Sequence, residues 1–223
     1  MVKVFLVLIP AYNASPTISE LIEKTSKFVD KSDIVVVDDG SEDQTFDFAQ
    51  KAGAVVLKHK RNRGKGEALK TGFSYAQKKN YHALITMDAD LQHNPDSIPD
   101  FIRKTNESFG IIIGTRKIDL EIMPFARWLT NNLTSVILSV LSGQSIRDSQ
   151  SGYRLISTRV LREIKLKSKK YDLESEILIK AIRKGFQIGE VPIETIYQEG
   201  KSFINPLIDT GRFIKLMWRS LWW

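Results

Sequence analysis

The first half of the chain alternates short apolar, β-branched runs with stretches of helical periodicity, and this alternation restricts the possible folds more than any other feature. Such runs are typical of strands buried on both faces of a parallel sheet, with the helices as crossover connections. The predicted strands are residues 4–9, 34–37, 54–58, 83–87 and 111–113, and the predicted helices are residues 16–29, 43–51, 66–78 and 95–105. The sequence therefore predicts an α/β fold with a mostly parallel central sheet flanked by helices.

The second half of the chain is more helical. Helical patterns cover residues 124–141, 172–184 and 206–223, with short strand candidates at 153–156 and 188–191. The apolar N-terminal run breaks at Pro10. It is shorter than the roughly 20 residues needed to cross a bilayer, so we expect a buried strand. We expect one catalytic domain over residues 1–205, followed by an amphipathic C-terminal helix over 206–223.

Polar or glycine-rich segments follow four of the predicted strands. They are Pro10-Ala11-Tyr12-Asn13, Asp38-Asp39-Gly40-Ser41, Arg61-Asn62-Arg63-Gly64-Lys65-Gly66 and Asp88-Ala89-Asp90. In open α/β sheets, ligands bind beyond the carboxyl ends of the strands. The sequence therefore predicts that these four segments meet at one edge of the sheet and form a site.

The pair Asp88 and Asp90, with Gln92 beside it, has the oxygen chemistry of a magnesium or manganese site. Mg²⁺ takes one or two protein carboxylates and completes its shell with water and substrate phosphates. A solvated acidic turn is the alternative for so short a pattern. Its position after a strand, among three other polar strand ends, favours the metal site.

The two other charged segments suit a nucleotide. Asp38 and Asp39 are adjacent acids at a strand end, where a carboxylate can hydrogen-bond a ribose or a base. Residues 61–66 combine three cations and two glycines at a helix start, which suits a phosphate, although their spacing is not that of a P-loop. A plain basic loop before a helix is the alternative for this segment.

In order and spacing, these motifs resemble the family 2 glycosyltransferases of GT-A (nucleotide-diphospho-sugar transferase) fold. The resemblance is strongest to the dolichol- and polyprenol-phosphate mannosyl- and glucosyltransferases. Later segments agree with it: Gly114-Thr115-Arg116, Asp148-Ser149-Gln150-Ser151-Gly152-Tyr153-Arg154, Tyr171-Asp172-Leu173-Glu174-Ser175-Glu176 and Glu190-Val191-Pro192-Ile193. Two positions differ from the usual pattern: Ala14 replaces a Glu, and Lys201 stands near the place of a late Arg.

The resemblance implies an inverting transfer of mannose or glucose from a GDP- or UDP-sugar, assisted by Mg²⁺ or Mn²⁺. The nucleotide-sugar site would comprise Pro10, Tyr12, Asn13, Val37, Asp38 or Asp39, Lys65, Asp88, Ala89 and Asp90. Asp88, Asp90 and Gln92 would hold the metal, and Asp90, Arg116 and Asp148 would be the catalytic residues. Asp148 would serve as a base if the acceptor is a hydroxyl group.

The expected acceptor is a polyprenyl or dolichyl phosphate. A phosphate monoester with a second pKa of about 6 is largely dianionic at neutral pH and attacks without a strong base. Cations would bind it, and the candidates are Arg116, Arg127, Arg154 and Lys201. A sugar hydroxyl in polysaccharide or glycolipid synthesis is the alternative acceptor.

Charge and the C-terminus point to a membrane surface. The net charge is +7, and three of the four tryptophans, Trp218, Trp222 and Trp223, alternate with Lys and Arg near the C-terminus. Such a helix suits a membrane interface, with packing on the protein as its alternative. We expect a cytoplasmic protein, peripheral on the inner face of the membrane. A nucleic-acid-binding module would also explain the charge, but the acids gathered at the predicted site disfavour it.

Overall fold

The computed structural model describes residues 5–105, 109–116, 125–168 and 172–194. Its centre is a seven-stranded sheet in the order β3-β2-β1-β4-β6-β5-β7. The strands are β1 (Phe5–Ala11), β2 (Ile34–Asp38), β3 (Val55–Lys58), β4 (Ala83–Thr86), β5 (Ile111–Arg116), β6 (Arg154–Ser157) and β7 (Ile188–Ile193). Every pairing is parallel except those of β6, which is antiparallel to β4 and β5. The prediction of a mostly parallel sheet is confirmed.

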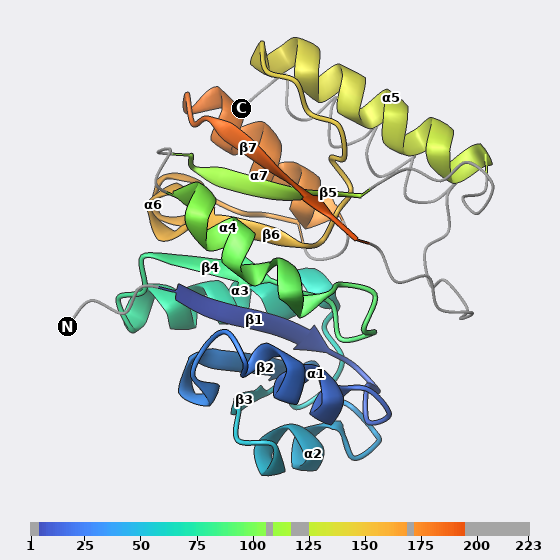
Figure 1. The fold of residues 1–223 in the computed structure, drawn as a ribbon, viewed down its shortest axis with the longest axis vertical. Helices are drawn as coiled ribbons and strands as arrows, with labels where there is room; N and C mark the ends of the chain where they lie inside the picture. Colours follow the sequence, from blue (N-terminus) through green and yellow to red (C-terminus); the bar gives the residue numbers. More distant parts are fainter. Residues whose placement is uncertain (1–4, 106–108, 117–124, 169–171, 195–223) are drawn as a thin grey trace.

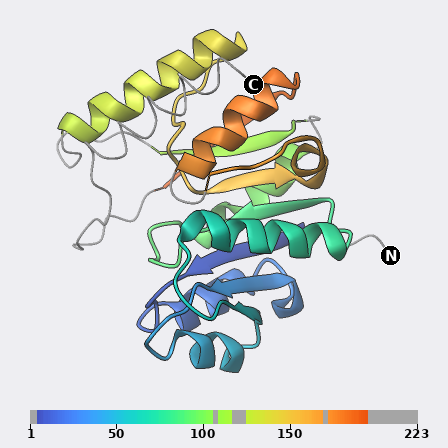
Figure 2. The same ribbon diagram turned by 180° about the vertical axis from the view of Figure 1, so that it is seen from behind.

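Helices cover both faces of the sheet (Figures 1 and 2). They are α1 (Ile18–Thr25), α2 (Thr45–Lys51), α3 (Lys65–Lys78), α4 (Ile98–Lys104), α5 (Phe125–Ser142), α6 (Thr158–Glu163) and α7 (Asp172–Arg183), with short 3₁₀ turns η1 (Lys31–Asp33) and η2 (Pro95–Ser97). Helices α1, α2 and α4 pack on one face, and α3, α6 and α7 pack on the other. Helix α5 lies next to α7.

The two faces of the sheet bury two separate hydrophobic cores. Successive side chains of a strand point to opposite faces. Leu6 and Leu8 therefore pack on the α3 side, while Val7 and Ile9 pack on the α1 side. Each fully buried side chain of this size stabilises the fold by roughly 1.5–3 kcal/mol. The continuous apolar runs of the sequence arise because both faces of the sheet are covered.

Within the described residues, the predicted elements match the observed ones with two main differences. Residues 95–105 form η2 followed by α4 rather than one helix, because Pro95 and Pro99 each fit only near a helix start. Helix α6 was not predicted; its first turn is capped by Ser157, whose hydroxyl accepts a hydrogen bond from the Val160 amide at 3.3 Å. The helix predicted over residues 206–223 lies outside the described residues.

The direction of β6 positions part of the site. Its first residue, Arg154, pairs with Thr86 of β4 and Ile113 of β5, toward the carboxyl ends of those strands. An antiparallel strand begins at the edge where its neighbours end. The loop that precedes β6, with Asp148 and Gly152, therefore lies at the same edge as the loops that follow β1, β2, β4 and β5.

Within the described part of the chain, no helix has both the length and the apolar character needed to cross a membrane.

Candidate active site

Asp38 and Asp39, adjacent at the end of β2, have different environments. Asp38 is fully buried, and its Oδ1 accepts a hydrogen bond from the Ser41 amide at 2.9 Å. Its Oδ2 accepts none from the described residues, and the Lys58 ammonium lies 3.9 Å away. Leaving a buried acceptor without a hydrogen bond costs about 1–3 kcal/mol. Asp38 therefore has an acceptor available for a ligand.

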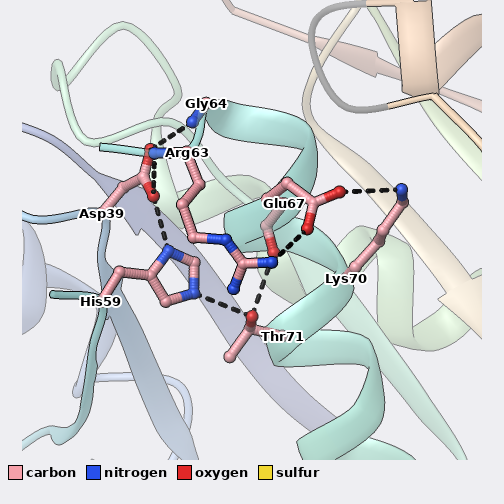
Figure 3. Close-up of polar contacts among 7 residues, drawn as sticks. All are labelled: Asp39, His59, Arg63, Gly64, Glu67, Lys70 and Thr71. Carbon is pink, nitrogen blue, oxygen red and sulfur yellow. Dashed lines mark hydrogen bonds and ion pairs between the residues drawn. The ribbon is translucent and has the colours of Figure 1, made fainter. Parts of the chain in front are cut away.

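Asp39 is instead saturated by the protein itself (Figure 3). Its carboxylate accepts hydrogen bonds from the Gly64 amide at 2.7 Å, the Arg63 amide at 3.0 Å and the His59 Nδ1 atom at 2.6 Å. The sequence left either acid open as a nucleotide ligand. The contacts distinguish the two acids. Asp38 keeps an acceptor oxygen for a ligand, whereas Asp39 accepts hydrogen bonds from the loop before α3.

The same contacts change the interpretation of residues 61–66 as a phosphate-binding loop. The amides of Arg63 and Gly64 already donate to the Asp39 carboxylate. The Arg63 guanidinium pairs with Glu67, one turn along α3, at 2.7 Å. A phosphate would have to displace Asp39 to reach these amides, so the loop is an internally bound structure rather than an open anion cradle.

Lys65, at the start of α3, is the cation that reaches the predicted metal site. Its Nζ lies 2.6 Å from Asp88 Oδ1 and 3.0 Å from Glu174 Oε1 of helix α7. Gly152 covers this trio, because a Cβ there would lie 3.0 Å from Asp88 Oδ2 and 3.1 Å from Lys65 Nζ. Glu174 is a site residue to which sequence reasoning assigned no role, since only the packing of α7 against α3 brings it to Lys65.

The charges of the trio stabilise one another. Burial lowers the pKa of Lys65, but the carboxylates of Asp88 and Glu174 outweigh that effect and raise it well above its ordinary value. Burial raises the pKa of Asp88, but the Lys65 ammonium outweighs it and holds that pKa below the ordinary value. Lys65 and Asp88 are therefore both ionised at neutral pH.

His93 supports the turn that carries Asp88. Its Nδ1 accepts a hydrogen bond from the Asp88 amide at 3.1 Å, and its ring stacks on Tyr153 with 5.0 Å between centroids. Burial lowers the pKa of His93 and outweighs the opposing effect of Asp88 and Asp90, so the imidazole is neutral at pH 7. A neutral ring with an unprotonated Nδ1 is the form that this hydrogen bond requires.

The oxygen donors of this turn fit a divalent cation that also binds phosphate. Asp90 is exposed. Among the contacts described, its Oδ1 accepts one hydrogen bond, from the Gln92 amide at 3.0 Å. No group of three His, Cys, Asp or Glu side chains in the described residues forms a protein-only metal cage. Mg²⁺ is typically bound by one or two protein carboxylates, and phosphate and water oxygens complete its coordination shell.

Arg116, at the end of β5, is held by Asp148. The guanidinium donates to both carboxylate oxygens, with Nε to Oδ2 at 2.6 Å and Nη2 to Oδ1 at 2.8 Å. Asp148 is 2% exposed. Paired in this way, Asp148 fixes the direction of Arg116. Acting as the predicted base would require it to give up part of that pairing.

Among the four predicted acceptor cations, the structure describes the side chains of Arg116 and Arg154. Arg154 is buried, and its guanidinium donates to the carbonyl oxygens of Ser149, Ser151 and Glu174 at 2.6 to 2.7 Å. It therefore braces the loop before β6 against α7, and binding of an acceptor phosphate to Arg154 stays a prediction that these internal contacts disfavour. The Arg127 side chain and all of Lys201 lie outside the described residues.

The remaining predicted nucleotide residues fall into two groups. Tyr12 is 46% exposed and can face a base, whereas Val37 and Pro10 are buried in the sheet and can only support it. Asn13 links two site loops, since its amide donates to Ser41 Oγ and its Oδ1 accepts from the Glu42 amide, both at 3.0 Å. Ala89 is half-buried on the turn beside Asp88, where its carbonyl accepts a hydrogen bond from Thr17.

Comparisons with known proteins agree with this geometry. Residues 6–165 match the family model for glycosyl transferase family 2. A UDP-N-acetylglucosamine–dolichyl-phosphate N-acetylglucosaminyltransferase of Methanococcus voltae is 32% identical, over 88% of this chain and 87% of its own. An undecaprenyl-phosphate mannosyltransferase of Micrococcus luteus is 30% identical, over 87% of this chain and 84% of its own.

Solved structures share the fold. The glucosyl-3-phosphoglycerate synthase of Mycobacterium tuberculosis, crystallised with Mn²⁺, UDP-glucose and phosphoglyceric acid, has a TM-score of 0.79. The match covers 98% of this chain and 79% of that one, at 21% sequence identity. The GT-A fold predicted from the motifs is thus confirmed, and the chain belongs to glycosyl transferase family 2.

Proposed function

We propose that the protein transfers a hexose, mannose or glucose, from a GDP- or UDP-sugar to a polyprenyl or dolichyl phosphate, with inversion at the anomeric carbon. The observation that carries this proposal is the bidentate Arg116–Asp148 pair, whose Arg116 also acts electrostatically on Asp88. The pair holds the Arg116 guanidinium in a fixed position, where it can bind an acceptor phosphate. It also keeps Asp148, the candidate general base, hydrogen-bonded to Arg116.

The donor half of the proposal rests on Asp38 and Asp88. The free Oδ2 of Asp38 suits a donor group of the base or ribose, and the exposed Tyr12 ring suits stacking. Asp88 and Asp90, with Gln92, would hold Mg²⁺ or Mn²⁺, which when bound supplies Lewis-acid stabilisation of the leaving diphosphate. Lys65, beside Asp88, adds a second positive charge against the same developing negative charge.

The acceptor half rests on acid–base chemistry. A sugar hydroxyl needs a general base within hydrogen-bond reach, whereas a phosphate dianion does not. Both Asp148 oxygens already accept hydrogen bonds from the Arg116 guanidinium. The pair therefore favours a phosphate over a hydroxyl group as the sugar acceptor. The names of the two relatives, which both act on a lipid-linked phosphate, support the same choice.

A donor and acceptor panel tests this function. UDP- and GDP-linked glucose, mannose and N-acetylglucosamine would each be incubated with the protein, a polyprenyl phosphate and Mg²⁺ or Mn²⁺. We expect a labelled lipid that releases its sugar in mild acid, as a glycosyl phosphate does. Label that survives mild acid would instead identify a hydroxyl acceptor. No product with any donor would refute the proposal.

We further propose that the protein works at a membrane surface, on the cytoplasmic face. Leu133, Val136 and Val140 of α5 are 55%, 55% and 77% exposed and follow helical spacing on one side of the helix. An exposed apolar stripe on an amphipathic helix suits the headgroup boundary of a bilayer. The tryptophan-rich residues 206–223, outside the described residues, would add to this contact.

Replacing Leu133, Val136 and Val140 together by Asn is expected to reduce binding to anionic liposomes. Flotation of the wild type and the variant on the same vesicles measures the bound fraction. The thermal midpoint should stay within a few degrees of the wild type, because exposed side chains contribute little to stability. Equal flotation of both proteins would exclude the α5 stripe as the membrane contact.

A further inference from the structure

The loop between β3 and α3 sets the position of Lys65. Residues 59–64 form this connection, and Lys65 is the first residue of the helix. Gly64, the residue before the helix, has a φ of 95° and supplies no side-chain cap. The direction in which Lys65 leaves the loop, and hence its approach to Asp88 and Glu174, depends on contacts that hold the loop from outside.

Asp39 provides those contacts. It binds the amides of Arg63 and Gly64, the two residues that lead into Lys65. The loop also packs on the neighbouring Gly40, where a Cβ would lie 2.4 Å from the carbonyl carbon of Arg61. The end of β2 therefore acts as a template for the loop, with the Asp39 carboxylate as its hydrogen-bonding part.

The orientation of Asp39 in turn depends on His59. The His59 Nδ1 atom lies 2.6 Å from Asp39 Oδ1, and its Nε2 atom lies 2.9 Å from Thr71 Oγ in the second turn of α3 (Figure 3). A carboxylate only accepts, so Nδ1 carries the proton that it shares with Asp39. His59 is only 8% exposed. The chain Asp39–His59–Thr71 thus connects β2, β3 and α3 around the loop.

We propose that His59 is a positioning residue: by fixing Asp39 it holds residues 61–64 in the conformation that delivers Lys65 to Asp88 and Glu174. This inference rests on the proposed function, in which Lys65 faces the departing diphosphate. It assigns to the Asp39–His59–Thr71 chain a role in the rate of transfer rather than in contact with either substrate.

Two substitutions of His59 test its Nδ1 and Nε2 positions separately. His59→Asn keeps a donor attached to Cγ, near the place of Nδ1, and is expected to preserve the contact with Asp39. His59→Gln places its amide near Nε2 and is expected to lose that contact. The control is Lys60→Gln, which changes the exposed neighbour of His59 and leaves the chain intact.

The first measurement needs no turnover. Hydrogen exchange at the Arg63 and Gly64 amides should accelerate about tenfold or more in His59→Gln, because a hydrogen bond to a charged group is weakened. His59→Asn and Lys60→Gln should exchange close to the wild-type rate. Unchanged exchange in His59→Gln would overturn the proposal, whatever the transferase assay shows.

The second measurement is a double-mutant cycle with Lys65→Met. His59→Gln should lower kcat by about tenfold to a hundredfold, as a misplaced catalytic group does, with a smaller change in KM. In the Lys65→Met background, His59→Gln should lower kcat little further, because the lysine that His59 positions is no longer present. Equal losses in both backgrounds would show that His59 does not act through Lys65. Absence of transfer in the wild type would refute the proposed function alone, since the exchange result still decides the role of His59.

Discussion

Asp88→Asn is expected to lower kcat by about a hundredfold or more, the usual loss when an electrostatic group at the reacting centre is removed. Asp88 lies 2.6 Å from Lys65 and is the more buried of the two predicted metal-binding carboxylates. The amide keeps the size of the side chain but loses the charge that would bind the cation. Lys65 keeps Glu174 at 3.0 Å, so the fold should survive. Initial rates at saturating donor, with the thermal midpoint as a check on folding, measure the effect.

A matched control uses the same change nearby. Asp96→Asn alters an exposed acid in η2, just after the site turn, and should leave kcat within about twofold of the wild type. Asp90→Asn should lower activity and raise the Mg²⁺ or Mn²⁺ concentration needed for half of the maximal rate. Full turnover in Asp90→Asn at low metal would show that Asp90 is not a metal ligand.

Glu176→Ala is expected to destabilise the protein by about 3–5 kcal/mol, the range for removing one partner of a buried ion pair. Glu176 is fully buried in α7. Its carboxylate accepts hydrogen bonds from the Ser168 amide at 2.7 Å, the Lys167 amide at 3.0 Å and the Lys180 ammonium at 2.6 Å. Alanine leaves these donors without their acceptor. Urea unfolding measures the change in the free energy of unfolding.

The control for this variant is an exposed glutamate. Glu163→Ala removes a side chain that is 41% exposed and that meets Arg159 at 3.3 Å. Surface pairs of this kind contribute about 0–1 kcal/mol, so the free energy of unfolding should change by less than that. Comparable losses in both variants would contradict the structural role given to Glu176.

Glu176 should also make stability depend on pH. Burial raises its pKa, but the hydrogen bonds from Lys180, Ser168 and Lys167 outweigh burial and hold that pKa below the ordinary value of 4.5. A lowered pKa stabilises the folded state above pH 4.5, and this contribution is lost as the pH falls through the folded-state value. The wild type should therefore lose more stability than Glu176→Gln does as the pH falls below about 4.5. Parallel pH profiles would exclude a lowered pKa at Glu176.

Much of the fold was predictable because strands and helices are local patterns. The apolar runs that form β1 and β2 are continuous because both faces of the sheet are buried. The helical periodicity of the apolar residues is enough to predict α3 and α7. Helix α6 escaped prediction because six residues contain too little periodicity to be recognised. The placement of Asp38 and Asp88 at strand ends was visible for the same local reason.

The role of each residue within the site was less predictable, because it depends on partners far away in the chain. Nothing in the adjacent acids Asp38 and Asp39 tells which one accepts hydrogen bonds from the loop before α3. Arg154 resembles a phosphate ligand in sequence, yet three carbonyl oxygens hold it in the interior. Hydrogen bonds of this kind exist only once distant backbone segments have come together.

The sequence by itself determined the α/β architecture, the edge of the sheet at which the candidate site lies and the Asp88-Ala89-Asp90 turn as its predicted chemical centre. Only the tertiary structure decided which groups surround that turn. The antiparallel β6 brings Asp148 and Gly152 to the edge, and the packing of α7 against α3 adds Glu174 to Lys65 and Asp88. The physical reason is that strand direction and helix packing come from burial of the whole chain, whereas period and motif are properties of short segments.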